Sequence, residues 1–106
     1  MAFQPRGGPA QVLRVSAAVP TDPAAPTDAE VAAGVFSFAA VTTRVRIKTA
    51  TNPVKVFFRE EDFRKGANYA LVSTTEVLSE PVETRSLWLM GSGGTASVEL
   101  LAILKG

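Results

Sequence analysis

The sequence contains neither cysteine nor histidine among its 106 residues. Without cysteine, no disulfide and no thiolate metal site can stabilise a small core. Without histidine, the chain lacks the usual general base near neutral pH and the commonest metal ligand. These absences exclude Ser-His-Asp and Cys-His catalysis. Carboxylate or lysine chemistry stays open, but the carboxylates form no recognisable spaced pair, so we expect no enzymatic activity, no metal and no cofactor.

Long apolar runs are also missing. None approaches the ~20 residues that a membrane helix requires, and the N-terminal residues MAFQPRGGPA lack the apolar segment of a signal peptide. We therefore expect a protein that is made and assembled in the cytoplasm and has no membrane partner.

Basic side chains gather in the middle of a chain that is nearly neutral overall. The net charge is +1, which is weak support for a nucleic-acid binder. Residues 41–65, however, carry seven basic side chains against three acidic ones. Alternation in VTTRVRIKT places three of them on one strand face, and we predict that one aromatic lies beside them. These residues are Arg44, Arg46, Lys48 and Phe57. A solvated face is the first interpretation, an acidic protein partner the second, and nucleic acid the least favoured.

Short alternating segments separated by turn signals dominate the chain from residue 31. The period-two pattern is clearest at 41–49 and 54–58, and turn signals recur every ~8–12 residues. EEDFRK (60–65), closed by Gly66, predicts a single helical turn, and no segment predicts a helix of three turns. We therefore predict an all-β fold for residues 31–106, as a small antiparallel β-sandwich or jelly-roll-like domain.

The first 30 residues differ in composition, because proline, alanine and glycine dominate them and the tripeptide PTD occurs twice. Proline removes backbone donors and favours extended chain, so we predict an extended N-terminal arm over residues 1–30. Val12 and Leu13, in QVLRVS, would let the arm add a strand to the sheet edge of a neighbouring chain. A disordered tail is the alternative.

The last segment, SLWLMGSGGTASVELLAIL (86–104), is predicted to form a hairpin closed by GSGG. In that register Met90 lies opposite Thr95 and Leu89 opposite Ala96. One face is then a core face, and the other still carries four large apolar side chains: Trp88, Met90, Leu101 and Ile103. Burying each contributes ~1.5–3 kcal/mol, and leaving them wet creates an adhesive patch. We expect this second face to be covered by the arm, a sister subunit or a larger partner.

Two stretches carry a resemblance to a known class of proteins. NPVKVFFREEDFRKGANYALV (52–72) and SLWLMGSGGTASVELLAI (86–103) resemble the small β-sandwich capsid-decoration, or cement, proteins of tailed bacteriophages. The shared features are a V-x-V-F/Y-F strand, an acidic-aromatic loop ending in Gly-Ala-Asn-Tyr, and a closing Gly-x-Gly-Gly turn. The likeness spans about residues 35–106 and carries no catalytic residue.

The resemblance implies a non-enzymatic structural protein on the outer surface of a virion. Its expected partner is the major capsid protein or another virion structural protein, and a homo-oligomer is expected, with a trimer favoured. The alternative is a phage tail or head–tail adaptor or adhesion sandwich, including one that binds glycans.

Overall fold

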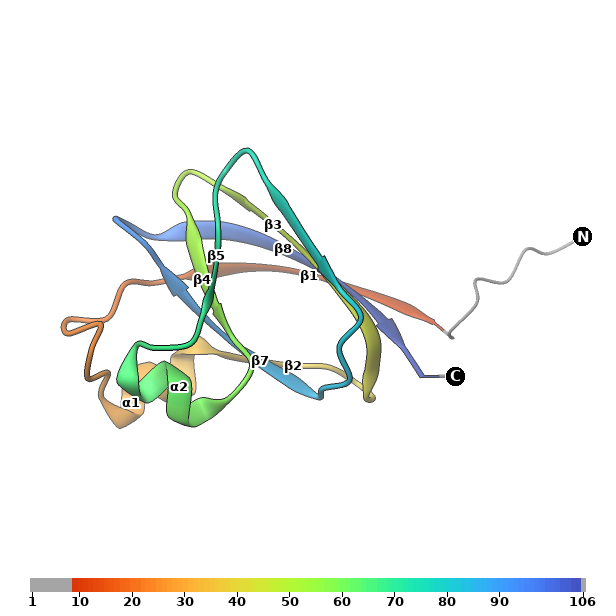
Figure 1. Cartoon of the computed structure of the whole chain (residues 1–106), viewed down its shortest axis with the longest axis horizontal. Helices are drawn as coiled ribbons and strands as arrows, with labels where there is room; N and C mark the ends of the chain where they lie inside the picture. Colours follow the sequence, from red (N-terminus) through yellow and green to blue (C-terminus); the bar gives the residue numbers. More distant parts are fainter. Residues whose placement is uncertain (1–8, 106) are drawn as a thin grey trace, which may run out of the picture.

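The computed structural model describes residues 9–105, which form eight strands and two short helices (Figure 1). The elements in chain order are β1 (Ala10–Ala17), α1 (Asp28–Gly34), β2 (Val35–Ser37), β3 (Thr42–Ala50), β4 (Val54–Phe57), α2 (Glu60–Lys65), β5 (Ala70–Val72), β6 (Val77–Glu80), β7 (Ser86–Gly91) and β8 (Ala96–Leu104). The first eight residues of the predicted arm lie outside the described residues.

The strands form two four-stranded antiparallel sheets that pack face to face. Sheet A has the order β1-β8-β3-β6, and sheet B has the order β2-β7-β4-β5. Strands therefore pair as β1 with β8, β2 with β7, β3 with β6 and β4 with β5. These pairings are those of one long antiparallel hairpin whose turn is the β4–β5 connection and whose two arms are folded into two layers. This is the strand order of a jelly roll. The predicted all-β antiparallel sandwich is confirmed.

Alternating side chains fill the space between the sheets. Along β8, each inward residue is buried and each outward residue is half-buried or exposed. β3 behaves in the same way from Arg44 onward, after a bulge between Thr42 and Arg44 that turns Thr42 inward. The core comprises Ala17, Phe38, Val45, Ile47, Val54, Val56, Val72, Leu87, Leu89, Ala96, Val98, Leu100, Ala102 and Leu104.

The predicted hairpin of β7 and β8 is wrong. β7 pairs with β2 and β4, whereas β8 pairs with β1 and β3, so GSGG carries the chain from one sheet to the other. Met90 therefore does not pair with Thr95, nor Leu89 with Ala96. The backbone bonds of this turn go to other segments, because Gly91 N–H donates to Ala18 O (3.1 Å) and Ser92 N–H donates to Pro53 O (2.9 Å). The prediction of which residues of β7 and β8 point inward is nevertheless correct. Alternate residues of each strand face the core whether the two strands are neighbours in one sheet or lie in opposite sheets.

The predicted arm is largely part of the sandwich. β1 pairs antiparallel with β8 of the same chain, from Ala10 opposite Ile103 to Ala17 opposite Ala96. Leu13 packs against the core, while Val12 points outward and is 50% exposed. The strand that we predicted at a neighbouring chain's sheet edge thus completes the edge of its own sheet, and residue 30 does not separate an arm from the domain.

A recognisable sequence signal marks the start of α1 and the end of α2. In α1, Thr27 Oγ1 accepts from Glu30 N–H (3.2 Å), and the Glu30 carboxylate accepts from Thr27 N–H (2.9 Å), which is a capping box. This helix was not predicted, although T-D-A-E shows the required spacing. The helical turn predicted at 60–65 is confirmed as α2, which ends at Gly66 in the left-handed region with φ 61°.

Replacing Gly66 with alanine should destabilise the fold more than the same change at Gly93. Both glycines have positive φ, +61° and +78°, so an alanine at either position is strained by about 1–2 kcal/mol. At Gly66 the new Cβ would also lie 2.3 Å from Pro23 O, whereas at Gly93 it would meet nothing within 4 Å. We expect Gly66→Ala to lower the free energy of unfolding by at least about 1 kcal/mol more than Gly93→Ala in urea titrations. Equal losses would show that the Pro23 contact does not constrain the chain.

Candidate docking surface

The outer face of sheet B is covered in part by the protein's own helices, while Leu71 of β5 stays 55% exposed on it. Phe57 and Met90 point outward from β4 and β7, yet both are fully buried against Val31 of α1 and Phe63 of α2. The rings of Phe57 and Phe63 meet edge to face, with centroids 5.3 Å apart. Trp88 packs beside this cluster and is half-buried.

The prediction that Met90 and Phe57 contact a partner is therefore wrong. The apolar face of residues 86–91 is covered by protein, as expected, but the cover is two helices of the same chain. Phe57 also does not lie beside the basic side chains of β3, because β3 and β4 belong to different sheets. The sequence pattern could not show this, because alternation assigns a residue to a side of its strand and not to a sheet.

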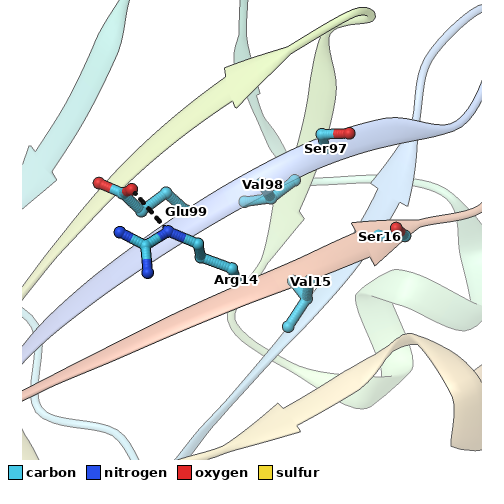
Figure 2. Close-up of a pocket in the computed structure, with 6 residues that line it drawn as sticks. All are labelled: Arg14, Val15, Ser16, Ser97, Val98 and Glu99. Atoms are coloured by element: carbon cyan, nitrogen blue, oxygen red, sulfur yellow. Dashed lines mark ion pairs between the residues drawn. The ribbon is translucent and has the colours of Figure 1, made fainter.

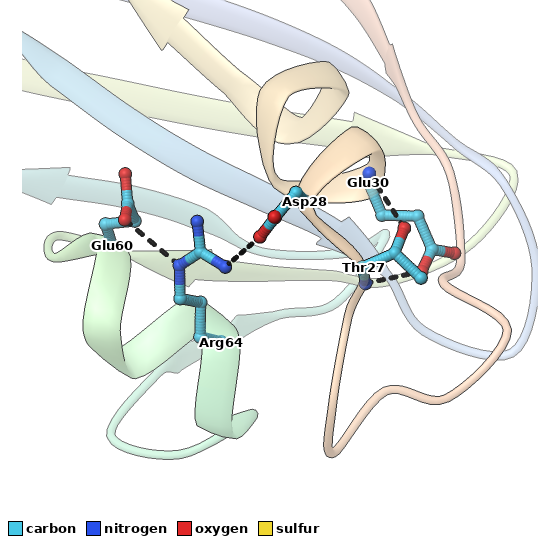
Figure 3. A network of polar contacts seen from close by, with 5 residues as sticks. All are labelled: Thr27, Asp28, Glu30, Glu60 and Arg64. Carbon is cyan, nitrogen blue, oxygen red and sulfur yellow. Dashed lines mark hydrogen bonds and ion pairs between the residues drawn. The ribbon is translucent and has the colours of Figure 1, made fainter.

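A polar network joins the two helices on their exposed side (Figure 3). The Arg64 guanidinium donates to Asp28 of α1 (2.7 Å) and to Glu60 of its own helix (3.0 Å). The hydrogen bond to Asp28, and then that to Glu60, raises the pKa of Arg64. Exposed pairs of this kind contribute little to stability. The network therefore orients the helices, and the apolar cluster beneath them supplies most of the binding energy of this cover.

The outer face of sheet A, in contrast, remains open. Both helices lie on the side of sheet B (Figure 1), and the outward residues of all four strands of sheet A are exposed or half-buried. We call these outward residues the open face. Its aliphatic members are Val12, Val77, Leu101 and Ile103, and its charged members are Arg14, Arg44, Arg46, Lys48 and Glu99.

Strand register interleaves the two kinds of side chain. Leu101 lies between Val12 of β1 and Arg46 of β3, and Ile103 lies opposite Arg44. One step further along, Glu99 lies between Arg14 and Lys48. Cross-strand neighbours on one face are in reach of each other. The aliphatic residues of the central strand β8 are thus flanked by cations on β3.

Beside a small hollow of about 130 Å³ lined by Arg46, Lys48, Glu99 and Leu101, two wider hollows mark this surface. The larger, of about 480 Å³, lies over β3, β6 and β8 and is lined by Arg44, Arg46, Val77, Ser79, Leu101 and Ile103. The other, of about 330 Å³, lies over β1 and β8 (Figure 2) and is lined by Arg14, Val15, Ser16, Ser97, Val98 and Glu99. Figure 2 shows the ion pair among these lining residues, in which Arg14 Nε lies 3.3 Å from Glu99 Oε2. Arg44 donates to Ser79 Oγ (3.0 Å), whereas Arg46 and Lys48 form no ion pair with any residue in 9–105.

The open face unites residues that the sequence analysis placed on separate surfaces. Leu101 and Ile103 were assigned to one predicted face and Arg44, Arg46 and Lys48 to another, and the pairing of β3 with β8 makes them neighbours. The prediction missed Arg14 and Val77, which join through the pairing of β1 with β8 and β6 with β3. Of the predicted arm residues, Val12 lies on this face and Leu13 does not.

No comparison supplies a name for this surface. The chain matches no family model, no curated protein and no solved structure. Within residues 9–105, no group of three or more His, Cys, Asp or Glu side chains is placed to hold a metal ion. Neither helix in this range has the length and apolar character to cross a bilayer. The open face is therefore the feature of the described residues that bears on function.

Met90→Ala, on the covered outer face, should destabilise the isolated protein more than Leu101→Ala, on the open face. Met90 is 0% exposed and fills the cluster beneath the helices, so its truncation should lower the free energy of unfolding by about 2–5 kcal/mol. Leu101 is only half-buried, so its truncation should cost about 1 kcal/mol or less. Denaturant unfolding monitored by Trp88 fluorescence measures both. The reverse order would mean that α1 and α2 do not cover sheet B in solution.

Acid should weaken the protein partly through Glu30. The backbone N–H groups of Thr27 and then Thr21 donate to its carboxylate, which lowers the pKa of Glu30 from its ordinary value of 4.5. The ionised form therefore stabilises the fold above pH 4.5, and this contribution disappears as the pH falls through the lowered pKa. We expect Glu30→Gln to be less stable than the wild type at pH 7 and to lose less stability between pH 5 and 3.

Thr27→Ala is the matched control for that experiment. It removes the capping hydroxyl and should cost about 1 kcal/mol, but the backbone donors to Glu30 remain. Its stability should therefore keep most of the wild-type dependence on pH. A Glu30→Gln variant whose stability falls as steeply in acid as that of the wild type would contradict the role of this carboxylate.

Proposed function

We propose that this protein is a non-enzymatic structural protein of a virion that binds the outside of an assembled capsid through its open face, as decoration proteins do. The observation that carries the proposal is the contrast between the two outer faces. On sheet B, two helices of the same chain bury Phe57 and Met90, although Leu71 of β5 stays 55% exposed, whereas sheet A presents four aliphatic side chains among cations with nothing in residues 9–105 over them. A patch of this kind marks a site of protein contact.

The size of the open face favours a repeated assembly over a single tight complex. Its longest strands have nine residues, so four strands span about 30 Å by 19 Å, on the order of 500–600 Å². A stable pairwise interface buries about 800 Å² on each partner. One copy would therefore dock weakly, and several copies on a lattice, or a homo-oligomer, would bind through avidity. A trimer placed on a capsid meets this requirement.

The glycan-binding alternative has less support in the geometry. Sugar-binding surfaces use exposed aromatic rings, and the outward residues of β1, β8, β3 and β6 include none. Tyr69 is 39% exposed, but it lies on the side of sheet B, where Lys55 sits 4.8 Å from its ring centroid. A structural place in a tail or head–tail connector would use the open face in the same way as a place on the capsid.

Particle composition tests the proposal. Phage particles purified from the organism that encodes the chain should contain it in a fixed ratio to the major capsid protein, measured by quantitative mass spectrometry. The double change Arg46→Glu and Leu101→Asp should leave a folded protein that is absent from the particles, because it places acid on the open face. Lys65→Glu, a charge reversal on exposed α2 that matches the Arg46→Glu part of the double change, should be incorporated normally.

The wild-type chain must be present for the proposal to survive. Particles that lack it would refute a virion role. Incorporation of the double variant at the wild-type level would refute docking through the open face. Thermal unfolding of each purified variant establishes that it is folded.

A further inference from the structure

The chemistry of the open face identifies what kind of partner it fits. We infer that the open face binds an acidic protein surface on which aliphatic side chains are flanked by carboxylates, and not nucleic acid or a second copy of this chain. The inference rests on the proposed docking function and specifies the partner's side of the contact.

The open face is positively charged. The open face carries four cations against one carboxylate, a net charge of +3, and that carboxylate, Glu99, is already paired with Arg14. Arg46 and Lys48 have no ion-pair partner within residues 9–105. A docked surface that left them dry and unpaired would be strongly disfavoured. The partner must therefore present carboxylates opposite β3.

The larger hollow of the open face combines aliphatic and cationic side chains. The hollow of about 480 Å³ is lined by Leu101 and Ile103 of β8 on one side and by Val77 of β6 on the other, with Arg44 and Arg46 of β3 between them. An aliphatic side chain that enters this hollow would gain apolar contact on β8 and β6. A carboxylate next to it in the partner would then reach the guanidinium groups, which bind carboxylates in a bidentate manner. Aliphatic anchors beside acidic residues thus satisfy both halves of the surface at once.

Nucleic acid fits this surface poorly. Single strands bind by stacking bases on aromatic rings above a basic groove. The one aromatic that the sequence placed near these cations, Phe57, is fully buried against Phe63 on the other sheet. Phosphates would also leave Val12, Leu101 and Ile103 without apolar contacts.

A second copy of the chain also fits poorly. Two open faces packed together would bring Arg46 and Lys48 of each copy against like charges. Three of the five acidic residues of α1 and α2 are already ion-paired, because Arg64 binds Asp28 and Glu60 and Arg59 pairs with Glu61. Glu30 accepts from two backbone N–H groups. The opposite side of a copy therefore offers few carboxylates to this face.

Selection from a random peptide display library on the immobilised full chain tests the inference without knowledge of the partner. Enriched peptides should combine Asp or Glu with adjacent Leu, Ile or Val. The best peptide, made synthetically, should bind the wild type at least about tenfold more tightly than Arg46→Glu and Leu101→Asp, each tested alone, which corresponds to 1.4 kcal/mol. Lys65→Glu should bind it as the wild type does.

Several results would overturn the inference. These are no enrichment, enriched peptides without acidic residues, or equal binding by Arg46→Glu. If an oligothymidine strand binds more tightly than the best peptide and this binding is lost in Arg46→Glu, the face would be assigned to nucleic acid. Self-association in sedimentation, lost in the same variant, would assign it to a second copy.

The two experiments can fail separately. Acidic-aliphatic peptides together with virus particles that lack the chain would refute the virion proposal and support the partner chemistry. The chain in particles together with peptides that lack acidic residues would refute the partner chemistry and leave the virion proposal standing.

Discussion

The passage of the chain between sheets at residues 91–95 decides where every apolar side chain of the last two strands lies. Gly91 stands at the start of this passage, where a Cβ would lie 2.3 Å from Gly94 O and 2.6 Å from Ala17 O, so only glycine fits without a shift of the backbone. Because β7 and β8 face each other, Leu89 and Leu100 both point into the core. The outward residues of β7 and those of β8 therefore lie on opposite outer faces of the molecule. Met90 of β7 is covered by helices, whereas the outward residues of β8 are left open.

The alternation of the sequence was sufficient to predict the class of fold and the inward residues, because a buried strand repeats every two residues in any sandwich. It was not sufficient to predict strand partners. Leu87 and Leu89 point inward whether β8 lies beside β7 or across from it, so the pattern could not distinguish a hairpin from a crossing. The pairings that distinguish them, such as Val45 with Ala102, join residues far apart in the sequence and depend on the packing of the whole chain.

Local alternation could predict the outward residues of each strand of the open face but not that these strands are neighbours. The exposed row on β3 and the outward position of Leu101 and Ile103 both follow from local alternation, but their union follows from the pairing of β3 with β8. The cover over Met90 was within reach of sequence reasoning, because Thr27 and Glu30 have capping-box spacing and begin the helix that carries Val31 onto it. The prolines of the same segment favour extended chain and so compete with that signal.

The two outer faces solve one problem in different ways. Sheet B buries Phe57 and Met90 under α1 and α2, which turn charged groups such as Asp28 and Arg64 to the outside. Sheet A keeps its aliphatic residues accessible and sets cations between them. Like charges oppose the packing of one open face on another, and lysine or arginine on a sheet discourages uncontrolled association. The same cations would attract an acidic partner, so the arrangement discriminates against self-contact and in favour of docking with a single set of side chains.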